Sequence, residues 1–182
     1  MKLFPFVIVA VLASTADAGS VWKGTAYENP DRWKEQDQGD NRILVAPSRA
    51  GEVLVVIVTG QFKLEKTPAI HLEALVRTVE KAATKVDHSA PTTSRTADFT
   101  MTAMTSRVED AALGTSNRIY ELVSNSTDAV FVAVVSKGDA SLADQRKVVT
   151  QILASWHPTT TAAQTASDDD NSICRHTGQS AG

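Results

Sequence analysis

Apolar residues in two segments of the chain recur every three or four positions, which is the spacing of an amphipathic helix. The first segment begins at Thr67 and Pro68, a capping residue followed by proline at the first helical position, where its missing N–H costs nothing. One stripe of this helix is apolar and consists of Leu72, Leu75, Val76, Val79 and Ala83. The polar residues between them are expected to face water, namely Glu73, Arg77, Glu80 and Lys81.

The second helical segment begins at Ser141, whose hydroxyl can cap the helix while Asp144 stands three residues later, as in a capping box. Its buried face is predicted to hold Leu142, Val148, Val149, Ile152, Leu153 and Trp156. The helix is expected to end at His157, because the residue before Pro158 is pushed out of the α region.

Short apolar runs outside these helices predict β-strands. The runs at 53–58 and 129–135 are continuous, rich in β-branched residues and too short for typical helices. Both faces of these strands are therefore expected to be buried. Weaker strand patterns lie at 42–46, 99–105 and 118–123, with turn residues at 48–51 and 125–128.

Adjacent strands with only two helices predict an α+β fold built on an antiparallel sheet. Because central strands that are buried on both faces need cover on both sides, we expect helices on both faces, a helix–sheet–helix sandwich. The length from residue 19 to residue 158 suits one domain. From Thr159 to Gly182 the chain offers one large aliphatic side chain, Ile173, and we predict a disordered C-terminal tail.

The first 18 residues have the order of a secretory signal peptide. Lys2 precedes an apolar run at 3–13, which is too short to span a bilayer, and Ala16–Ala18 form a small-x-small cleavage pattern. A core strand or helix is the alternative, but the charge, the apolar run and the cleavage pattern favour a signal peptide. We expect a mature protein that begins at Gly19, is exported to the periplasm or secreted, and has no transmembrane segment.

Composition narrows the classes of function. The 182 residues carry a net charge of −3, and the sequence pI is about 5.8, so no general positive field favours nucleic acid. A single cysteine, Cys174, excludes a scaffold of intrachain disulfides and could pair only with another molecule.

No residue set matches a known catalytic, cofactor-binding or metal motif. The chain lacks a glycine-rich phosphate loop, a Gly-x-Ser-x-Gly elbow and paired zinc ligands. We therefore assign no catalytic, cofactor-binding or metal residue and expect no cofactor. A Ser–His–acid triad stays open because its members meet only in the fold, and the candidate bases are His71, His88, His157 and His176.

Three other features have a structural and a functional interpretation. Asp168–Asp170, Cys174 and His176 could chelate a soft metal, but a solvated tail is favoured. The sequon Asn125-Ser126-Thr127 is better explained as a polar turn than as a glycosylation site. Trp22 is the one aromatic residue considered for a contact surface.

Several short motifs resemble those of the PsbP-like family, which includes bacterial envelope proteins of the DcrB type. The matching segments are Tyr27–Trp33, with its aromatic and Pro-x-x-Trp element, Arg118–Val123 with Ala129–Val135, and Ile152–Trp156. The stretch from Asp87 to Asp110 departs most from the family pattern. The resemblance implies an antiparallel sheet flanked by helices, with Trp33 and Trp156 against the core.

The resemblance also implies a non-enzymatic accessory or binding role. The function predicted from the sequence is therefore that of an exported accessory or binding protein of the cell envelope, whose partner is another envelope protein or a small ligand. The alternative is a small secreted hydrolase with an unrecognised active site. A pocket that gathers a histidine, a carboxylate and a hydroxyl would favour the hydrolase. The oligomeric state is left open.

Overall fold

The computed structural model describes residues 20–28, 30, 32–47 and 51–159. These residues form two helices, α1 (Pro68–Val79) and α2 (Asp139–Ser155), and two antiparallel sheets. The small sheet consists of β1 (Ser20–Trp22), β2 (Thr25–Tyr27) and β12 (His157–Pro158). The large sheet consists of β3 (Lys34–Gln38), β4 (Asn41–Val45), β5 (Val53–Thr59), β6 (Phe62–Lys63), β7 (Lys85–His88), β8 (Thr92–Arg95), β9 (Thr100–Asp110), β10 (Gly114–Ser124) and β11 (Asp128–Lys137).

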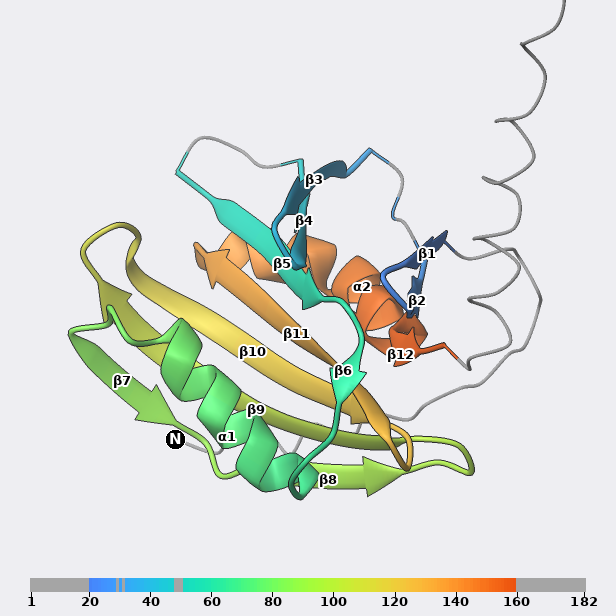
Figure 1. Ribbon diagram of the computed structural model, residues 1–182. Helices are drawn as coiled ribbons and strands as arrows, with labels where there is room; N and C mark the ends of the chain where they lie inside the picture. The colour runs from blue at the N-terminus through green and yellow to red at the C-terminus, as the bar shows by residue number, and fades with distance from the viewer. Residues whose placement is uncertain (1–19, 29, 31, 48–50, 160–182) are drawn as a thin grey trace, which may run out of the picture.

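The large sheet is ordered β3-β4-β5-β11-β10-β9-β7, with β6 paired to β11 and β8 paired to β9 (Figure 1). Every described pair is antiparallel. The five strand patterns of the sequence correspond to β4, β5, β9, β10 and β11, and the turn at 125–128 joins β10 to β11. The predicted antiparallel α+β fold is thus confirmed, although residues 1–19, residues 48–50 of the predicted turn at 48–51, and residues 160–182 lie outside the description.

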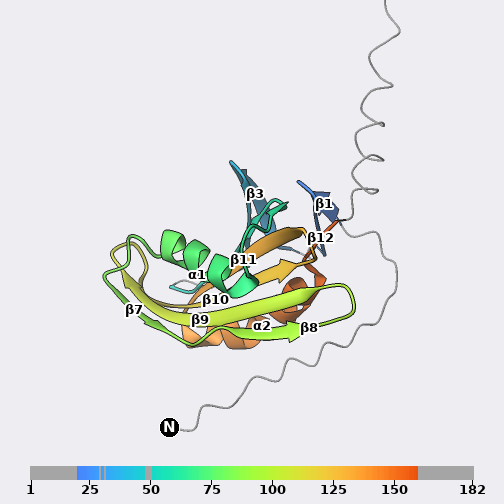
Figure 2. The ribbon, with the colours of Figure 1, turned by 60° about the horizontal axis from the view of Figure 1, so that its bottom comes forward.

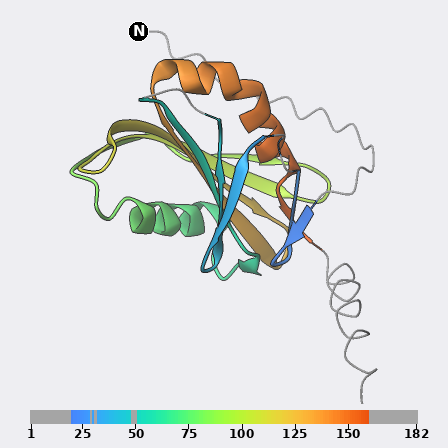
Figure 3. The same ribbon diagram turned by 90° about the horizontal axis from the view of Figure 1, so that it is seen from above.

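Strand β11 runs through the centre of the sheet and contributes to two separate hydrophobic clusters. Phe131 belongs to a cluster that includes Leu72 of α1, whereas Val132 belongs to a cluster that includes Ile152 of α2. Successive residues of a strand point to opposite faces, so the two clusters lie on opposite sides of β11. Figure 3 shows the two helices separated by the sheet.

The helices nevertheless cover only part of the sheet. The main contacts of α1 are with β9 and β10, and those of α2 are with β11, β5 and β2 (Figure 2). Both faces of β11 are buried along almost its whole length, but β5 alternates between buried and half-buried residues. The expectation that both faces of β5 are buried is therefore wrong, because α1 lies over other strands.

The helix boundaries differ from the sequence patterns at three points. Helix α1 ends at Val79, which is 40% exposed, so the end of the predicted apolar stripe, including Ala83, is wrong. Helix α1 begins at Pro68, but Thr67 makes no side-chain capping bond. Helix α2 begins at Asp139, two residues before the predicted cap Ser141. The earlier start follows Gly138, whose φ of 87° is a conformation that favours glycine and turns the chain from β11 into the helix. No helix in the described part is long and apolar enough to cross a membrane.

The small sheet joins the two ends of the described domain. Its central strand β2 pairs with β1 and with β12, so that Ala26 lies opposite His157. The backbone N–H of Thr159 donates to Gly24 O at 2.7 Å, and its hydroxyl donates to the same oxygen at 2.9 Å. Thr159, the first residue of the predicted tail, is buried and thus packs with the domain.

Candidate functional site

Six polar residues gather on the side of the large sheet that faces α1. We call them the α1 polar cluster, and they are Glu80, His88, Ser106, Asp110, Arg118 and Tyr120. Glu80 was expected to face water, but its side chain is only 4% exposed. The expectation is wrong because the chain leaves the helix at this residue, the C-cap of α1, and the carboxylate reaches the sheet.

Strand register places the other members of the cluster side by side. His88 at the end of β7 lies opposite Ser106 of β9, and Ser106 lies opposite Arg118 of β10. Paired residues of antiparallel strands point to the same face, and so does Tyr120, two residues after Arg118. His88, one of the four candidate bases, therefore lies at a strand end on the edge of the sheet.

A chain of contacts runs through the cluster. The Ser106 hydroxyl and His88 Nδ1 are 2.9 Å apart, and His88 Nε2 lies 3.3 Å from Glu80 Oε2. The Tyr120 hydroxyl donates to Glu80 Oε1 at 2.8 Å. Burial, and secondly the hydrogen bond to Glu80, raise the pKa of Tyr120, so this phenol stays a neutral donor.

Arg118 and Asp110 form an ion pair beside this chain of contacts. Arg118 Nη2 lies 2.5 Å from Asp110 Oδ2, and both side chains are mostly buried. The backbone N–H of Leu113 donates to Asp110 Oδ1, as does that of Ala112. The bond from Leu113 is the main cause that lowers the pKa of Asp110, with the bond from Ala112 and Arg118 adding to it. The pair therefore fixes the β9–β10 turn.

A pocket of about 290 Å³ lies at the Asp110–Arg118 end of the cluster. It is lined by Val79, Ala82, Ala83, Asp110, Ala111, Ala112, Leu113 and Arg118. This volume is at the lower end of small-molecule sites. Arg118 and Asp110 reach the pocket wall, but His88, Ser106 and Glu80 are not among its lining residues.

The histidine, the carboxylate and the hydroxyl that a hydrolase would need are thus brought together, but not in an open site. Ser106 is 5% exposed and Glu80 is buried, whereas 38% of the His88 side chain is exposed. In the serine-protease triad the hydroxyl contacts Nε2 and the carboxylate contacts Nδ1. In this protein the arrangement is reversed, since Nδ1 of His88 contacts the Ser106 hydroxyl and Nε2 contacts the Glu80 carboxylate. The arrangement fits a brace between α1 and the sheet edge.

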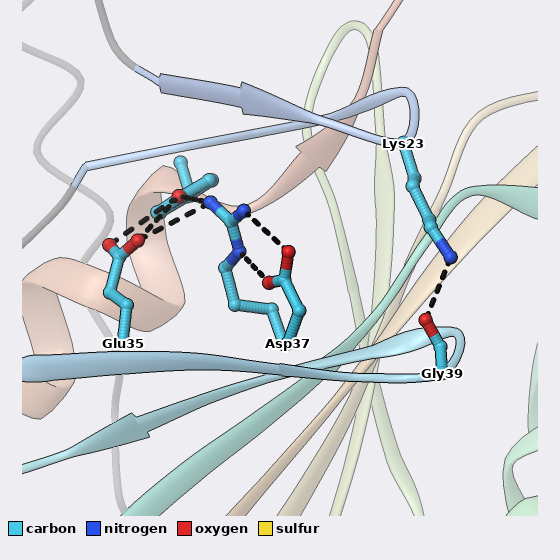
Figure 4. A network of polar contacts seen from close by, with 6 residues as sticks. Lys23, Glu35, Asp37 and Gly39 are labelled. Atoms are coloured by element: carbon cyan, nitrogen blue, oxygen red, sulfur yellow. Dashed lines mark hydrogen bonds and ion pairs between the residues drawn. The ribbon is translucent and has the colours of Figure 1, made fainter.

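A second polar network joins the small sheet to the β3–β4 hairpin (Figure 4). Arg42 forms ion pairs with Glu35 and Asp37, and it contacts the Tyr27 hydroxyl. The hydrogen bond from Arg42 lowers the pKa of Asp37. Lys23 binds Asp40 at 2.8 Å and donates to Gly39 O at 2.8 Å.

Aromatic rings pack beneath this network. The Arg42 guanidinium lies 5.0 Å from the centre of the Trp22 ring, and Tyr27 stacks on Trp156 at 4.9 Å between ring centres. Trp22 is buried, so it does not provide the contact surface that the sequence analysis considered. Trp33 and Trp156 lie in the core, as the family resemblance implies.

Glu121 is a buried carboxylate on the opposite face of β10. It is 2% exposed, and its Oε1 has no hydrogen-bond partner among the described residues. Burial raises its pKa to about 7. Trp156 Nε1, in the cluster that contains α2, is likewise buried without a partner.

The described histidines lie apart from one another. His71 on α1 packs against Phe62, with 5.2 Å between ring centres. His157 in β12 contacts Ser155 O through Nδ1 at 2.7 Å, just beyond the end of α2. In the described residues no three metal-ligating side chains are grouped. His176, Cys174 and Asp168–Asp170 lie outside the description.

Sequence reasoning missed most of the α1 polar cluster. The visible signals were the alternation of Ser116, Arg118 and Tyr120 along one strand, and a serine at 106 in a strand of otherwise mixed pattern. Neither signal shows which residues meet. The turn at Asn125 is as expected, since its Oδ1 accepts from the backbone N–H groups of Thr127 and Asp128.

No family model and no curated protein sequence matches the chain. Among the solved structures that resemble it, two do so over most of its length. One is the solution structure of cyanobacterial PsbP (CyanoP) from Synechocystis sp. PCC 6803, with a TM-score of 0.55 at 12% identity over 77% of this chain and 89% of that one. The other is LpqN, involved in cell envelope biogenesis of Mycobacterium tuberculosis, with a TM-score of 0.51 at 14% identity over 80% and 87% of the two chains. The chain has a PsbP-like fold, as its motifs predict.

Proposed function

We propose that this chain is an exported accessory or binding protein of the cell envelope and that it acts without turnover of a substrate. The likeness of its fold to LpqN supports the envelope context. The signal-peptide pattern of residues 1–18 supports export. Fold alone does not set function, so the argument against turnover comes from the α1 polar cluster.

The burial of Ser106 and Glu80 is the observation that carries the proposal. A nucleophile has to reach the reacting carbon of a substrate, with donors placed for the developing charge. The Ser106 residue is 5% exposed, and the neighbouring pocket is lined by other side chains. The contacts from Ser106 through His88 to Glu80 stabilise the fold in this arrangement.

Two measurements on the full chain, expressed in a bacterial host, test the proposal. Fractionation should recover the protein from the periplasm or the medium, shortened at its N-terminus. Photo-crosslinking groups placed at exposed positions should then capture one reproducible envelope partner. Cytoplasmic recovery of the intact chain would contradict the proposal.

A small secreted hydrolase is the second candidate, and the Ser106–His88–Glu80 contacts are the observation that favours it. The exported protein would be exposed to a fluorophosphonate probe and a panel of short-chain esters. Turnover that is lost in both Ser106→Ala and His88→Ala, with Ser89→Ala as a matched control, would establish the hydrolase. We expect neither labelling nor turnover.

A further inference from the structure

Strands β4 and β5 carry aliphatic side chains on both faces, but one of these faces has no helix over it. This face carries Ile43 and Val45 of β4 with Val55 and Ile57 of β5, and we call these four side chains the bare β4–β5 face. All four are half-buried. Antiparallel strands with one solvated face normally alternate apolar and polar residues. The alternation is missing here, which indicates that a binding partner covers this face in the functional protein.

Strand register shows that the four side chains form one surface. Val45 lies opposite Val55, and Ile43 lies opposite Ile57. Val55 in turn lies opposite Val135 of β11, in the row that continues to Arg118 of the α1 polar cluster. The bare β4–β5 face is therefore on the same side of the sheet as α1. Figure 1 shows β4 and β5 away from α1, on the other side of β11.

Cluster membership shows that the cover from the α1 side reaches only one of the four side chains. Ile57 packs against the hydrophobic cluster that contains α1, whereas Ile43, Val45 and Val55 belong to neither cluster. The opposite face of the same strands is fully buried at Leu44, Val56 and Val58. Contiguous apolar surface of this kind, with a polar rim, marks interaction sites.

The rim of the surface carries positive charge. Lys34 of β3 lies opposite Val45. Lys137 of β11 follows Val135 by two residues and therefore points to the same face. Neither lysine forms an ion pair with a described residue. Gln36, opposite Ile43, completes a rim that contains no carboxylate at these positions.

We propose that the bare β4–β5 face binds an amphipathic helical segment of a partner protein, whose apolar side covers the four aliphatic side chains and whose acidic residues contact Lys34 and Lys137. This inference rests on the proposed binding function and identifies the chemistry of the partner. A helix in an apolar groove is a common mode of peptide recognition, and acidic residues complement the two lysines.

Other occupants fit this surface less well. The segment after Thr159 contains one large aliphatic side chain, Ile173, which is too little to cover four. A second copy of the chain that met this surface through the same face would bring a second set of lysines and no carboxylate to the rim. The surface has no aromatic residue of the kind that anchors proteins at membrane interfaces.

The test uses the exported full-length protein and two synthetic amphipathic helices of about five turns. Both peptides carry leucine on one side, and the other side carries glutamate in one peptide and lysine in the other. Binding is measured by fluorescence anisotropy at low and at physiological salt. We expect the glutamate peptide to bind at least about tenfold more tightly than the lysine peptide, with the difference reduced by salt.

Matched variants locate the binding site. Val45→Thr with Val55→Thr keeps the β-branched shape and should weaken the glutamate peptide by about tenfold or more. Lys34→Glu with Lys137→Glu should reverse the preference between the peptides. Lys66→Glu with Lys85→Glu changes the net charge equally at exposed sites away from the surface and should change neither result. Thermal unfolding of each variant confirms that the fold is kept.

Several results would overturn the inference. They are equal affinity for both peptides, no binding of the glutamate peptide, or self-association that the threonine variants abolish. Binding only after residues 160–182 are removed would assign the surface to the chain's own C-terminal segment, and threonine-sensitive binding of phosphatidylglycerol vesicles would assign it to a membrane. If peptide binding fails while an envelope partner is crosslinked elsewhere, the proposed function stands without this surface.

Discussion

The phenol of Tyr120 donates a hydrogen bond to the carboxylate of Glu80 at 2.8 Å, and this contact ties the end of α1 to the middle of β10. Both residues are buried, so water does not compete for the bond. Glu80 also contacts His88 on the edge strand β7. One carboxylate therefore connects a helix, a central strand and an edge strand.

Replacing Tyr120 by phenylalanine should lower the free energy of unfolding by about 1–3 kcal/mol, because one oxygen of a buried carboxylate loses its donor. Urea unfolding at pH 7 measures the effect. A double-mutant cycle with Glu80→Gln should show a coupling energy well above zero. Purely additive effects of the two changes would contradict the contact.

Glu121 should make stability fall with rising pH. Its folded pKa, about 7, lies above the ordinary value of 4.5, so the folded state holds the proton more tightly than the unfolded state. The stabilising difference is complete below pH 4.5 and is lost as pH rises to about 7. Glu121→Gln should therefore be more stable than the parent by about 3 kcal/mol at pH 8 and nearly equal to it at pH 4.

The exposed Glu109→Gln on the neighbouring strand is the matched control for this measurement. It should show no comparable pH-dependent gain, since its carboxylate is already in water. Equal stability of Glu121→Gln and the parent protein from pH 4 to pH 8 would show that the Glu121 carboxylate is solvated or paired.

Trp156→Ala and Phe131→Ala should each destabilise the fold by about 3–5 kcal/mol, as large-to-small changes in a core do. The two side chains belong to different clusters on opposite sides of the sheet. Their effects should therefore add to within about 0.5 kcal/mol in the double variant, measured by denaturant unfolding. Unfolding curves close to that of the parent protein would refute the packing of the two helices on the sheet.

A chain that ends at Ala162 should keep the thermal midpoint of the full chain, whereas a chain that ends at Pro158 should melt several degrees lower. The difference comes from Thr159, which makes two hydrogen bonds to Gly24 O. The loss of about 1–2 kcal/mol that these bonds represent shifts the midpoint measurably in a domain of this size. Equal midpoints for the two truncations would show that the contact contributes nothing.

N-terminal sequencing of the exported protein should return Gly19 as the first residue. The cleavage pattern at Ala16–Ala18 is the reason for this expectation. Ala18→Arg should block processing, because the peptidase needs a small residue at that position, and the intact Met1 terminus should then accumulate. Unchanged processing of this variant would show that the peptidase cleaves at another position.

The sequence alone was sufficient where neighbours along the chain determine the structure. The apolar period of α1 and the β-branched runs of β5 and β11 identify these elements, and Asn125 identifies its turn. The short strands β1, β2 and β12 were missed, because each is stabilised by pairing with residues far away in the chain, as Ala26 is with His157. Strands of two or three residues have no internal period and carry too little local signal.

Local patterning also indicated most of the aliphatic side chains that avoid water, but the tertiary structure decided what covers them. Val56 and Val55 look alike in the sequence, yet one is buried under α2 and the other is half-buried on the bare β4–β5 face. Glu80 and Glu73 look alike on one helix, yet only Glu80 reaches Tyr120. Periodicity records the tendency of each side chain to leave water, whereas its partner depends on strand register and on where α1 lies, which are set by contacts between distant segments.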